Sequence, residues 1–297
     1  KILRPIDYYK RQVGQYLCDA AWRTGLHLLE QVKNHKDTKR AEIAGSLRRC
    51  KEIVGDIDLL ASSDAPEGLM EHFVGAPGIE EIIARGTTKT SVRMIEGIQV
   101  DLRVVSDKQF PFALAYFTGS KEHNTALRGR ARKKKLKLNE YGLFRKGHDK
   151  SEPCEDETAI YRRLGLPFIE PELRENMGEI DAAEDGKLPE LVKESDIRGL
   201  VHVHSNWSDG RLSIEQMAQT AAGRGFEYVV ICDHSRSAAY ARGLTSDRVL
   251  EQHEEIDRVN QTLSGIRVFK GTEVDILADG SVDFEDDLLA RFDLVIA

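Results

Sequence analysis

Residues 45–60 read GSLRRCKEIVGDIDLL, and this stretch decides the fold of the first half of the chain. Asp56 and Asp58 are two residues apart in an apolar run, so in a strand both side chains project from one face. A lone pair of this kind is more often found on a surface or in a turn. Two neighbouring carboxylates repel each other unless a cation lies between them, so within a strand the pair predicts a divalent-cation site.

A third carboxylate interrupts a second strand. Asp101 lies in the alternating run VDLRVV, residues 100–105, with Gln99 and Arg103 on the same face. An acid in the middle of so apolar a strand needs a functional reason. Asp56, Asp58 and Asp101 together indicate phosphoryl transfer with two Mg²⁺ or Mn²⁺ ions.

Phosphate-binding residues precede the first acids. Gly45 and Ser46 lie at a turn where the backbone can approach a ligand closely, and the hydroxyl and amides can meet phosphate oxygens. The guanidinium group of Arg49 suits the same oxygens. These residues are the predicted phosphate-binding part of the site.

The charge distribution divides the 297-residue chain into two parts with different partners. Residues 1–150 contain 28 Lys and Arg against 19 Asp and Glu, a net charge of +9, whereas residues 151–297 contain 15 against 31, a net charge of -16. The basic part suits nucleic acid, and the acidic part would repel it unless its carboxylates bind cations. The sequence contains no apolar run long enough for a membrane span, and four scattered cysteines favour reduced thiols.

The local patterns predict two kinds of architecture along the chain. The first part is expected to hold helices over 6–35 and 79–85, two short strands within 41–60, a hairpin over 91–105, a basic helix within 111–137 and a short helix within 155–175. An acidic connector is expected over 176–197. The second part is expected to alternate strands (GLVHVH, YVVIC, IRVFKG, FDLVIA) with helices near 213–224 and 246–263, which favours a parallel α/β fold.

Histidines and carboxylates follow three successive predicted strands of the second part. Parallel strands bring their C-terminal ends to one edge, so these side chains are expected to converge as ligands for zinc, manganese or iron. A single histidine at a strand end is usually only a hydrogen-bonded residue, but three such groups favour a metal site. The predicted ligands are His202, His204, Asp209, His234 and Glu273.

The segment YFTGSKEHNTALRGRARKKKLKLNEYGLF, residues 116–144, closely resembles the nucleotide-selecting segment of family X DNA polymerases, the group that contains DNA polymerase beta. With the palm-like motifs GSLRR, GDIDLL and VDLR, the resemblance covers most of residues 40–175. It implies that Asp56, Asp58 and Asp101 are the catalytic metal ligands and that Gly45, Ser46 and Arg49 hold the triphosphate. Tyr116, Phe117 and Gly119 would contact the sugar, Asn124 the incoming base, and Arg128 the template strand.

Seven basic residues and no acid occupy residues 128–137, which suits a phosphate backbone. A solvated helix face or a localisation signal is the simpler alternative. The predicted DNA-binding residues are Arg128, Arg130, Arg132, Lys133, Lys134, Lys135 and Lys137.

Residues 198–297 resemble the PHP family, named for polymerase and histidinol phosphatase. The resemblance implies that the five predicted ligands bind metal, with Asp233 behind them and Cys232 not a ligand. Further ligands of the family would lie after Ala297, so we expect this domain to be incomplete.

The expected architecture is therefore multidomain, α/β and α+β. A nucleotidyltransferase palm (41–106) lies between a helical fingers-like region (1–40) and a small thumb (107–175), followed by a linker (176–197) and a partial PHP domain (198–297), a distorted β/α barrel. The resemblance implies gap-filling DNA synthesis in repair by a monomer in the cytoplasm, at the nucleoid. Primer–template or gapped DNA and deoxynucleoside triphosphates are the expected partners, with no membrane partner, and a 3′–5′ exonuclease is expected in a complete PHP domain. The alternatives are a template-independent nucleotidyltransferase, a small-molecule phosphatase in the PHP domain, and a non-catalytic DNA-end scaffold.

Overall fold

The computed structural model describes residues 14–145 and 147–297, so the expected helical residues 6–13 lie outside the described part. The chain forms two compact units, Lys1–Pro189 and Glu190–Ala297, each with its own hydrophobic core. The units are described separately.

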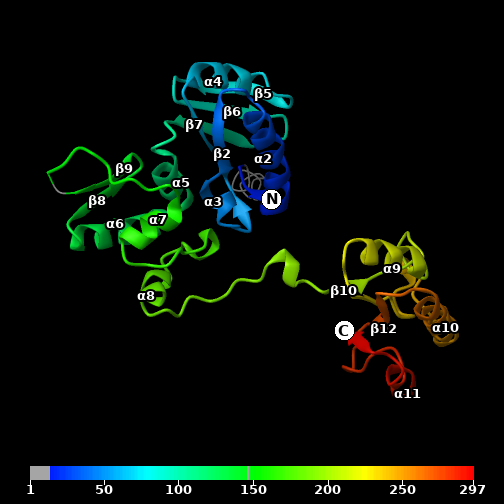
Figure 1. Ribbon diagram of the computed structural model, residues 1–297. Helices are drawn as coiled ribbons and strands as arrows, with labels where there is room; N and C mark the ends of the chain where they lie inside the picture. The colour runs from blue at the N-terminus through cyan, green and yellow to red at the C-terminus, as the bar shows by residue number, and fades with distance from the viewer. Residues whose placement is uncertain (1–13, 146) are drawn as a thin grey trace, which may run out of the picture. The chain divides into compact units, whose positions relative to one another are not determined.

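A five-stranded sheet in the order β2-β4-β7-β6-β5 forms the centre of the first unit (Figure 1). Its strands are β2 (Thr38–Ile43), β4 (Asp56–Ser63), β5 (Ile79–Arg85), β6 (Lys89–Met94) and β7 (Gln99–Val105). The neighbours β4 and β7 are parallel, and the other pairs are antiparallel. The elements around it are β1 (Tyr16–Leu17), α2 (Cys18–Lys33), α3 (Gly45–Arg48), β3 (Ile53–Val54) and α4 (Pro66–Val74).

Strand alternation gives β4 and β7 one apolar face and an opposite, mixed face, on which Leu60 packs with residues of α5 (Phe110–Thr118). Ile57, Leu59, Val100 and Leu102 are almost fully buried in the same core as residues of α2 and α4. The intervening residues of β4 and β7, including the three acids, therefore point to the opposite face. The core formed with α2 and α4 thus fixes which face presents the acids.

The structure confirms the predicted hairpin and corrects one predicted element. β6 and β7 pair antiparallel around a turn in which Gly97 has a φ of +89°, as the sequence indicates. Residues 79–85, predicted as a helix, form strand β5 instead. Glu and Ile permit a helix here, but Gly78 turns the chain with a φ of +85° and the edge of β6 supplies backbone partners, so pairing overrides local propensity.

The rest of the first unit forms a thumb-like cluster of helices with a small hairpin. It contains α5 (Phe110–Thr118), α6 (Lys121–Lys133), β8 (Leu136–Asn139), β9 (Gly142–Arg145), α7 (Glu157–Arg163) and α8 (Glu179–Glu184). Gly119 and Ser120 separate α5 from α6, and the Ser120 hydroxyl accepts a hydrogen bond from the His123 amide as an N-cap. The predicted basic helix is thus confirmed.

The connector between the two units is shorter than the sequence suggests. Ala183 of α8 is buried in the thumb core, and Ile180 and Leu188 pack against it. The apolar residues of 176–189 are therefore part of the first unit, and the second unit begins at Glu190.

The second unit contains a parallel sheet in the order β10-β11-β12-β13, as expected from the alternating pattern. Its strands are β10 (Gly199–Val203), β11 (Tyr228–Ile231), β12 (Arg267–Glu273) and β13 (Leu294–Ile296), and its helices are α9 (Ile214–Gly223), α10 (Ser246–Thr262) and α11 (Asp286–Leu289). The strands lie in chain order, which is the arrangement of part of a β/α barrel. In the described part of the chain, no helix combines the length and apolar character needed to cross a membrane.

Candidate active sites

The three palm acids lie together on one face of the sheet. Asp58 of β4 is the direct register partner of Asp101 on the neighbouring parallel strand β7, and Asp56 is the partner of Gln99. In-register residues of adjacent strands project to the same side. The sheet therefore brings Asp101 beside the Asp56–Asp58 pair, as the sequence predicted.

The electrostatics of the acids indicate excess negative charge. Burial, together with Asp56 and Asp101, raises the pKa of Asp58 to about 6. Burial and Asp101 also raise the pKa of Asp56. A bound divalent cation would relieve this repulsion, so the donor set fits a metal.

A lysine that sequence reasoning missed neutralises the third acid. Lys89 Nζ lies 2.5 Å from Asp101 Oδ2, and Gln99 Nε2 donates to Asp101 Oδ1 at 2.9 Å. Burial would raise the pKa of Asp101, but hydrogen bonds from Lys89, Gln99 and Ser91 bring it below its ordinary value. Lys89 begins β6, whose antiparallel pairing with β7 brings it to this acid; only that pairing could have revealed it.

The predicted phosphate-binding residues lie beside the acids. Gly45 has a φ of +66°, and a Cβ atom there would lie 2.3 Å from Asp58 Oδ2. Ser46 follows it in α3. Arg49 Nε donates to Glu175 Oε1 at 2.7 Å and Nη1 to the Thr118 carbonyl at 2.7 Å, so this guanidinium group is engaged by the thumb.

A buried ionic network also joins α3 to the thumb. Arg48 Nη2 and Arg174 Nη1 each donate to Glu157 at 2.6 Å, and Arg174 is fully buried. Burial would raise the pKa of Glu157, but its two arginine partners lower it below the usual range. The network fixes the palm and thumb ends of the site relative to each other within the first unit.

The predicted nucleotide-contact residues form one connected turn between α5 and α6. Asn124 Nδ2 donates to the Tyr116 carbonyl at 2.6 Å, and Arg128 Nε donates to the Asn124 carbonyl at 3.2 Å. The guanidinium group of Arg103 lies 4.4 Å from the centre of the Phe117 ring. A Cβ atom at Gly119 would lie 2.8 Å from Asn124 Oδ1, so a larger residue there would displace the Asn124 side chain.

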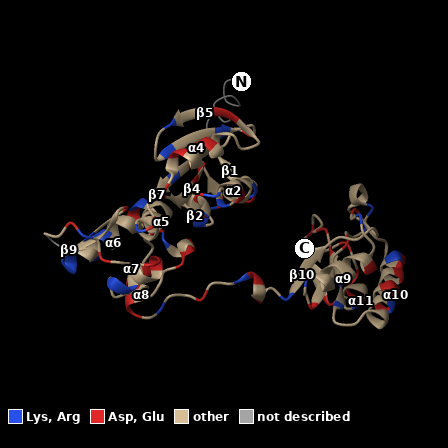
Figure 2. Ribbon diagram, turned by 45° about the horizontal axis from the view of Figure 1, so that its top comes forward, with Lys and Arg blue, Asp and Glu red and all other residues tan. Residues whose placement is uncertain are grey.

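Apart from the half-buried Arg128, the predicted DNA-binding cations divide into two groups. The guanidinium group of Arg130 donates hydrogen bonds within the thumb, to Glu184 and to the carbonyls of Leu164 and Gly165. Figure 2 shows Lys and Arg in blue on α6. The exposed members of the predicted set are Arg132, Lys133, Lys134, Lys135 and Lys137.

His123, to which the sequence assigned no role, is buried behind the nucleotide-contact turn. Its Nδ1 lies 2.6 Å from Glu179 Oε1 and its Nε2 lies 2.9 Å from the Tyr161 hydroxyl. Burial lowers the pKa of His123 despite the neighbouring carboxylate. A lone histidine on an amphipathic helix gives no signal of such partners, because Glu179 is 56 residues away.

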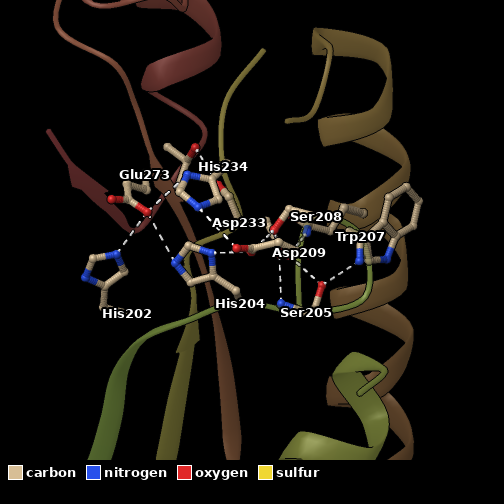
Figure 3. Close-up of polar contacts among 11 residues, drawn as sticks. His202, His204, Ser205, Trp207, Ser208, Asp209, Asp233, His234 and Glu273 are labelled. Atoms are coloured by element: carbon tan, nitrogen blue, oxygen red, sulfur yellow. Dashed lines mark hydrogen bonds and ion pairs between the residues drawn. The ribbon is translucent and has the colours of Figure 1, made fainter. Parts of the chain in front are cut away.

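The second site is a cluster of imidazoles and carboxylates at the C-terminal ends of the parallel strands (Figure 3). Glu273 Oε2 lies 3.2 Å from His202 Nε2, 3.3 Å from His204 Nε2 and 3.2 Å from His234 Nδ1. Asp209 Oδ1 lies 3.0 Å from His204 Nδ1, and Asp209 Oδ2 lies 3.7 Å from His234 Nε2. All five predicted ligands therefore converge, and their donor set fits a transition metal.

The backbone around His202 departs from a regular strand. His202 has a φ of +63°, and the register between β10 and β11 shifts between Leu200 and Val203. Such irregularities re-aim side chains at functional sites. The irregular backbone lies next to the converging rings of His202 and His204, whose centres are 5.3 Å apart.

Asp233 is buried below the cluster and organises the loop that carries Asp209. Its carboxylate accepts hydrogen bonds from the Ser205 amide at 2.8 Å, the Ser205 hydroxyl at 2.5 Å, the Ser208 hydroxyl, and Gln252 Nε2 at 2.6 Å.

Burial raises the pKa of the neighbouring Cys232 thiol to about 11, which disfavours the thiolate a metal would need.

Comparison with known proteins gives a family match in each of the two units. The family described as DNA polymerase beta thumb matches residues 113–175, and the PHP domain family matches residues 201–295. The chain is 38% identical over 301 residues to DNA polymerase/3′-5′ exonuclease PolX of Bacillus subtilis; the match covers 100% of this chain and 52% of that protein. Over 99 residues it is 37% identical to a probable phosphatase of Syntrophotalea carbinolica, covering 33% of this chain and 38% of that one. Leishmania infantum polymerase beta, solved as a ternary complex, is 27% identical with a TM-score of 0.49, covering 57% of this chain and 80% of that chain.

The sequence matches place a segment of the DNA polymerase beta thumb family in the first unit and a PHP domain in the second. Over its whole length the chain is similar to the Bacillus subtilis PolX protein, and it spans about half the length of that relative.

Proposed function

We propose that the first unit is the catalytic core of a template-directed DNA polymerase that adds deoxynucleotides to a primer 3′-hydroxyl, with gap filling in repair as its setting. The register that places Asp58 beside Asp101 carries the proposal. Primer–template or gapped DNA and deoxynucleoside triphosphates are the proposed substrates. A cytoplasmic location at the nucleoid is part of the same proposal.

The acids and the phosphate-binding residues would have different roles in the proposed reaction. Asp56, Asp58 and Asp101 would hold Mg²⁺ or Mn²⁺, which supplies charge neutralisation for the attacking oxygen and the leaving pyrophosphate. Gly45, Ser46 and Arg49 would orient the triphosphate so that the primer oxygen bonds to the α-phosphorus as the bond to the β-phosphate oxygen breaks. Since Glu175 and Thr118 hold Arg49 at present, triphosphate binding would exchange these partners for phosphate oxygens.

Asp101→Ala tests the assignment on single-nucleotide gapped DNA with each of the four template bases. Extension should fall by at least a thousandfold while DNA binding changes less than twofold, because Asp101 is not one of the predicted DNA-binding cations. Asp64→Ala, an exposed palm acid paired with Lys39, is the matched control and should extend normally. Extension by Asp101→Ala would refute the assignment, and extension that ignores the template base would favour the template-independent transferase.

For the second unit we propose a metal-dependent phosphoesterase, with Zn²⁺, Mn²⁺ or Fe held by His202, His204, Asp209, His234 and Glu273. The converging donors carry this proposal. In the complete protein we expect 3′–5′ exonuclease activity, which is part of the Bacillus subtilis relative's name; the probable phosphatase of Syntrophotalea carbinolica favours small phosphate esters instead.

Hydrolysis assays with each metal distinguish these substrates. Single-stranded DNA and a small phosphate monoester are compared for the wild-type chain and for His204→Ala. Preference for DNA that is lost in the variant supports the exonuclease, and preference for the monoester supports the phosphatase.

A further inference from the structure

The thumb has a second feature, a pocket of about 750 Å³ between the C-terminal end of α6, the β8–β9 hairpin and the loop after it. Its Lys and Arg side chains are Arg132, Lys135, Lys137 and Arg145, and Tyr141 and Phe144 contribute aromatic rings. This volume lies within the range of small-ligand sites and is large enough for a nucleotide. The pocket is separate from the palm acids.

Three of these four cations are available for a ligand. Within the described residues, Arg132, Lys135 and Lys137 form no ion pair, whereas Arg145 of the lining is paired with Glu152 and the nearby Arg130 with Glu184. Asp149 is the single acid in the described lining. The pocket therefore has a net positive charge and suits phosphate groups.

The aromatic residues of the pocket lie on a turn that hydrogen bonds hold in place. Asn139 Oδ1 accepts hydrogen bonds from the amides of Tyr141 at 3.0 Å and Gly142 at 3.1 Å, which fixes the tip of the hairpin. The Tyr141 side chain is nevertheless 57% exposed, and Phe144 is half-buried. An exposed ring on a rigid turn beside cations is a stacking platform for a flat ligand.

We propose that this pocket binds single-stranded DNA. Cations beside aromatic rings are the combination that holds unpaired nucleotides, because phosphates contact the cations while each base stacks on a ring. A duplex could use the cations, but its bases are stacked on one another and leave the rings unused. In the polymerase, the pocket holds unpaired template nucleotides; this role rests on the proposed function, whereas binding of a single strand does not.

Fluorescence anisotropy of the full chain with labelled oligo(dT) and with a blunt duplex tests the pocket. Tyr141→Leu should weaken oligo(dT) binding about 5- to 100-fold, the range of one lost stacking contact, and change duplex binding less than twofold. Tyr141→Phe keeps the ring and should bind as the wild type does. Circular dichroism and thermal unfolding verify that each variant is folded.

The charges are tested by salt dependence. The double variant Lys135→Gln/Lys137→Gln should reduce the slope of log K against log salt for oligo(dT) by about 1.4, since each lost phosphate contact removes about 0.7. Lys121→Gln, exposed on the first turn of α6 and outside the pocket, should leave the slope unchanged.

Two outcomes would overturn the pocket assignment. Equal losses for oligo(dT) and duplex in Tyr141→Leu would make the surface a general DNA contact, and no loss for either would exclude it as a site. Extension of gapped DNA is measured in parallel. If the wild type fails to extend while oligo(dT) binding depends on Tyr141, the proposed polymerase function fails and the single-strand site stands.

Discussion

At the residue scale, the arrangement of the palm acids that suits a metal ion lowers the stability of the metal-free protein. Burial and two neighbouring carboxylates raise the pKa of Asp58 to about 6, so its ionised form destabilises the metal-free protein. Because the folded-state pKa exceeds the unfolded value, the penalty is absent below about pH 4 and complete above about pH 7.

Asp58→Asn should therefore stabilise the first unit by about 1 to 3 kcal/mol at pH 8 without divalent cations. At pH 4 the variant and the wild type should be equally stable, while extension is abolished at any pH. Calorimetric unfolding at both pH values measures the difference. An equal gain at pH 4 and pH 8 would contradict the electrostatic origin of the effect.

Gly45 is a second residue whose identity is imposed by the site. Gly45→Ala would put a Cβ atom 2.3 Å from Asp58 Oδ2 and would strain a backbone with φ of +66°. We expect a loss of about 1 to 3 kcal/mol in stability and at least a tenfold loss of extension. The control for stability is Gly129→Ala in α6, where no atom would lie within 4 Å of the added Cβ atom. We expect this change to stabilise the protein by about 0.5 to 1 kcal/mol. Equal effects of the two changes would refute the steric argument.

At the element scale, α8 fixes the position of the helix that carries Asn124. Glu179 of α8 contacts the His123 ring and accepts hydrogen bonds from the Asn176 and Met177 amides at 2.9 and 2.7 Å. Glu179→Ala would leave the buried His123 ring without its carboxylate partner and should cost about 1 to 3 kcal/mol.

The matched control lies one turn further along the same helix. Glu184→Ala removes an exposed carboxylate paired with Arg130 and should lower the stability far less than Glu179→Ala does, because water screens an exposed ion pair. Urea unfolding of both variants measures the contrast, and the discrimination between correct and incorrect nucleotides should worsen only in Glu179→Ala. Similar costs for the two variants would mean that α8 is not a structural part of the thumb.

At the scale of the whole molecule, the described residues form separate cores in the two units, and each unit has its own set of proposed metal ligands. Manganese at 100 times its dissociation constant should stabilise the second unit by about 2.7 kcal/mol. His234→Ala should remove most of this gain and leave the unfolding of the first unit unchanged. Calorimetry of the full chain, with and without a chelator, tests this prediction. If the chelator shifts the unfolding of the first unit equally in the wild type and in Asp58→Asn, the two units are coupled.

Local sequence determined the hairpin, the basic helix, the parallel strands and the identity of the clustered acids and histidines. These features follow from alternation, from turn residues and from residue types whose chemistry has few alternatives at such spacing. The resemblance to known families added the expected roles, which geometry alone does not assign.

Only the tertiary structure decided the features that depend on distant partners. Residues 79–85 became a strand because β6 offered an edge, α8 joined the thumb because its apolar side chains found a core, and Lys89 and Glu179 found partners that are 12 and 56 residues away. Pairing and burial energies of this kind exceed local propensity, but they exist only after the chain has folded. The sequence therefore identified the groups to which the proposed chemistry is assigned, and the folded structure specified which groups position and neutralise them.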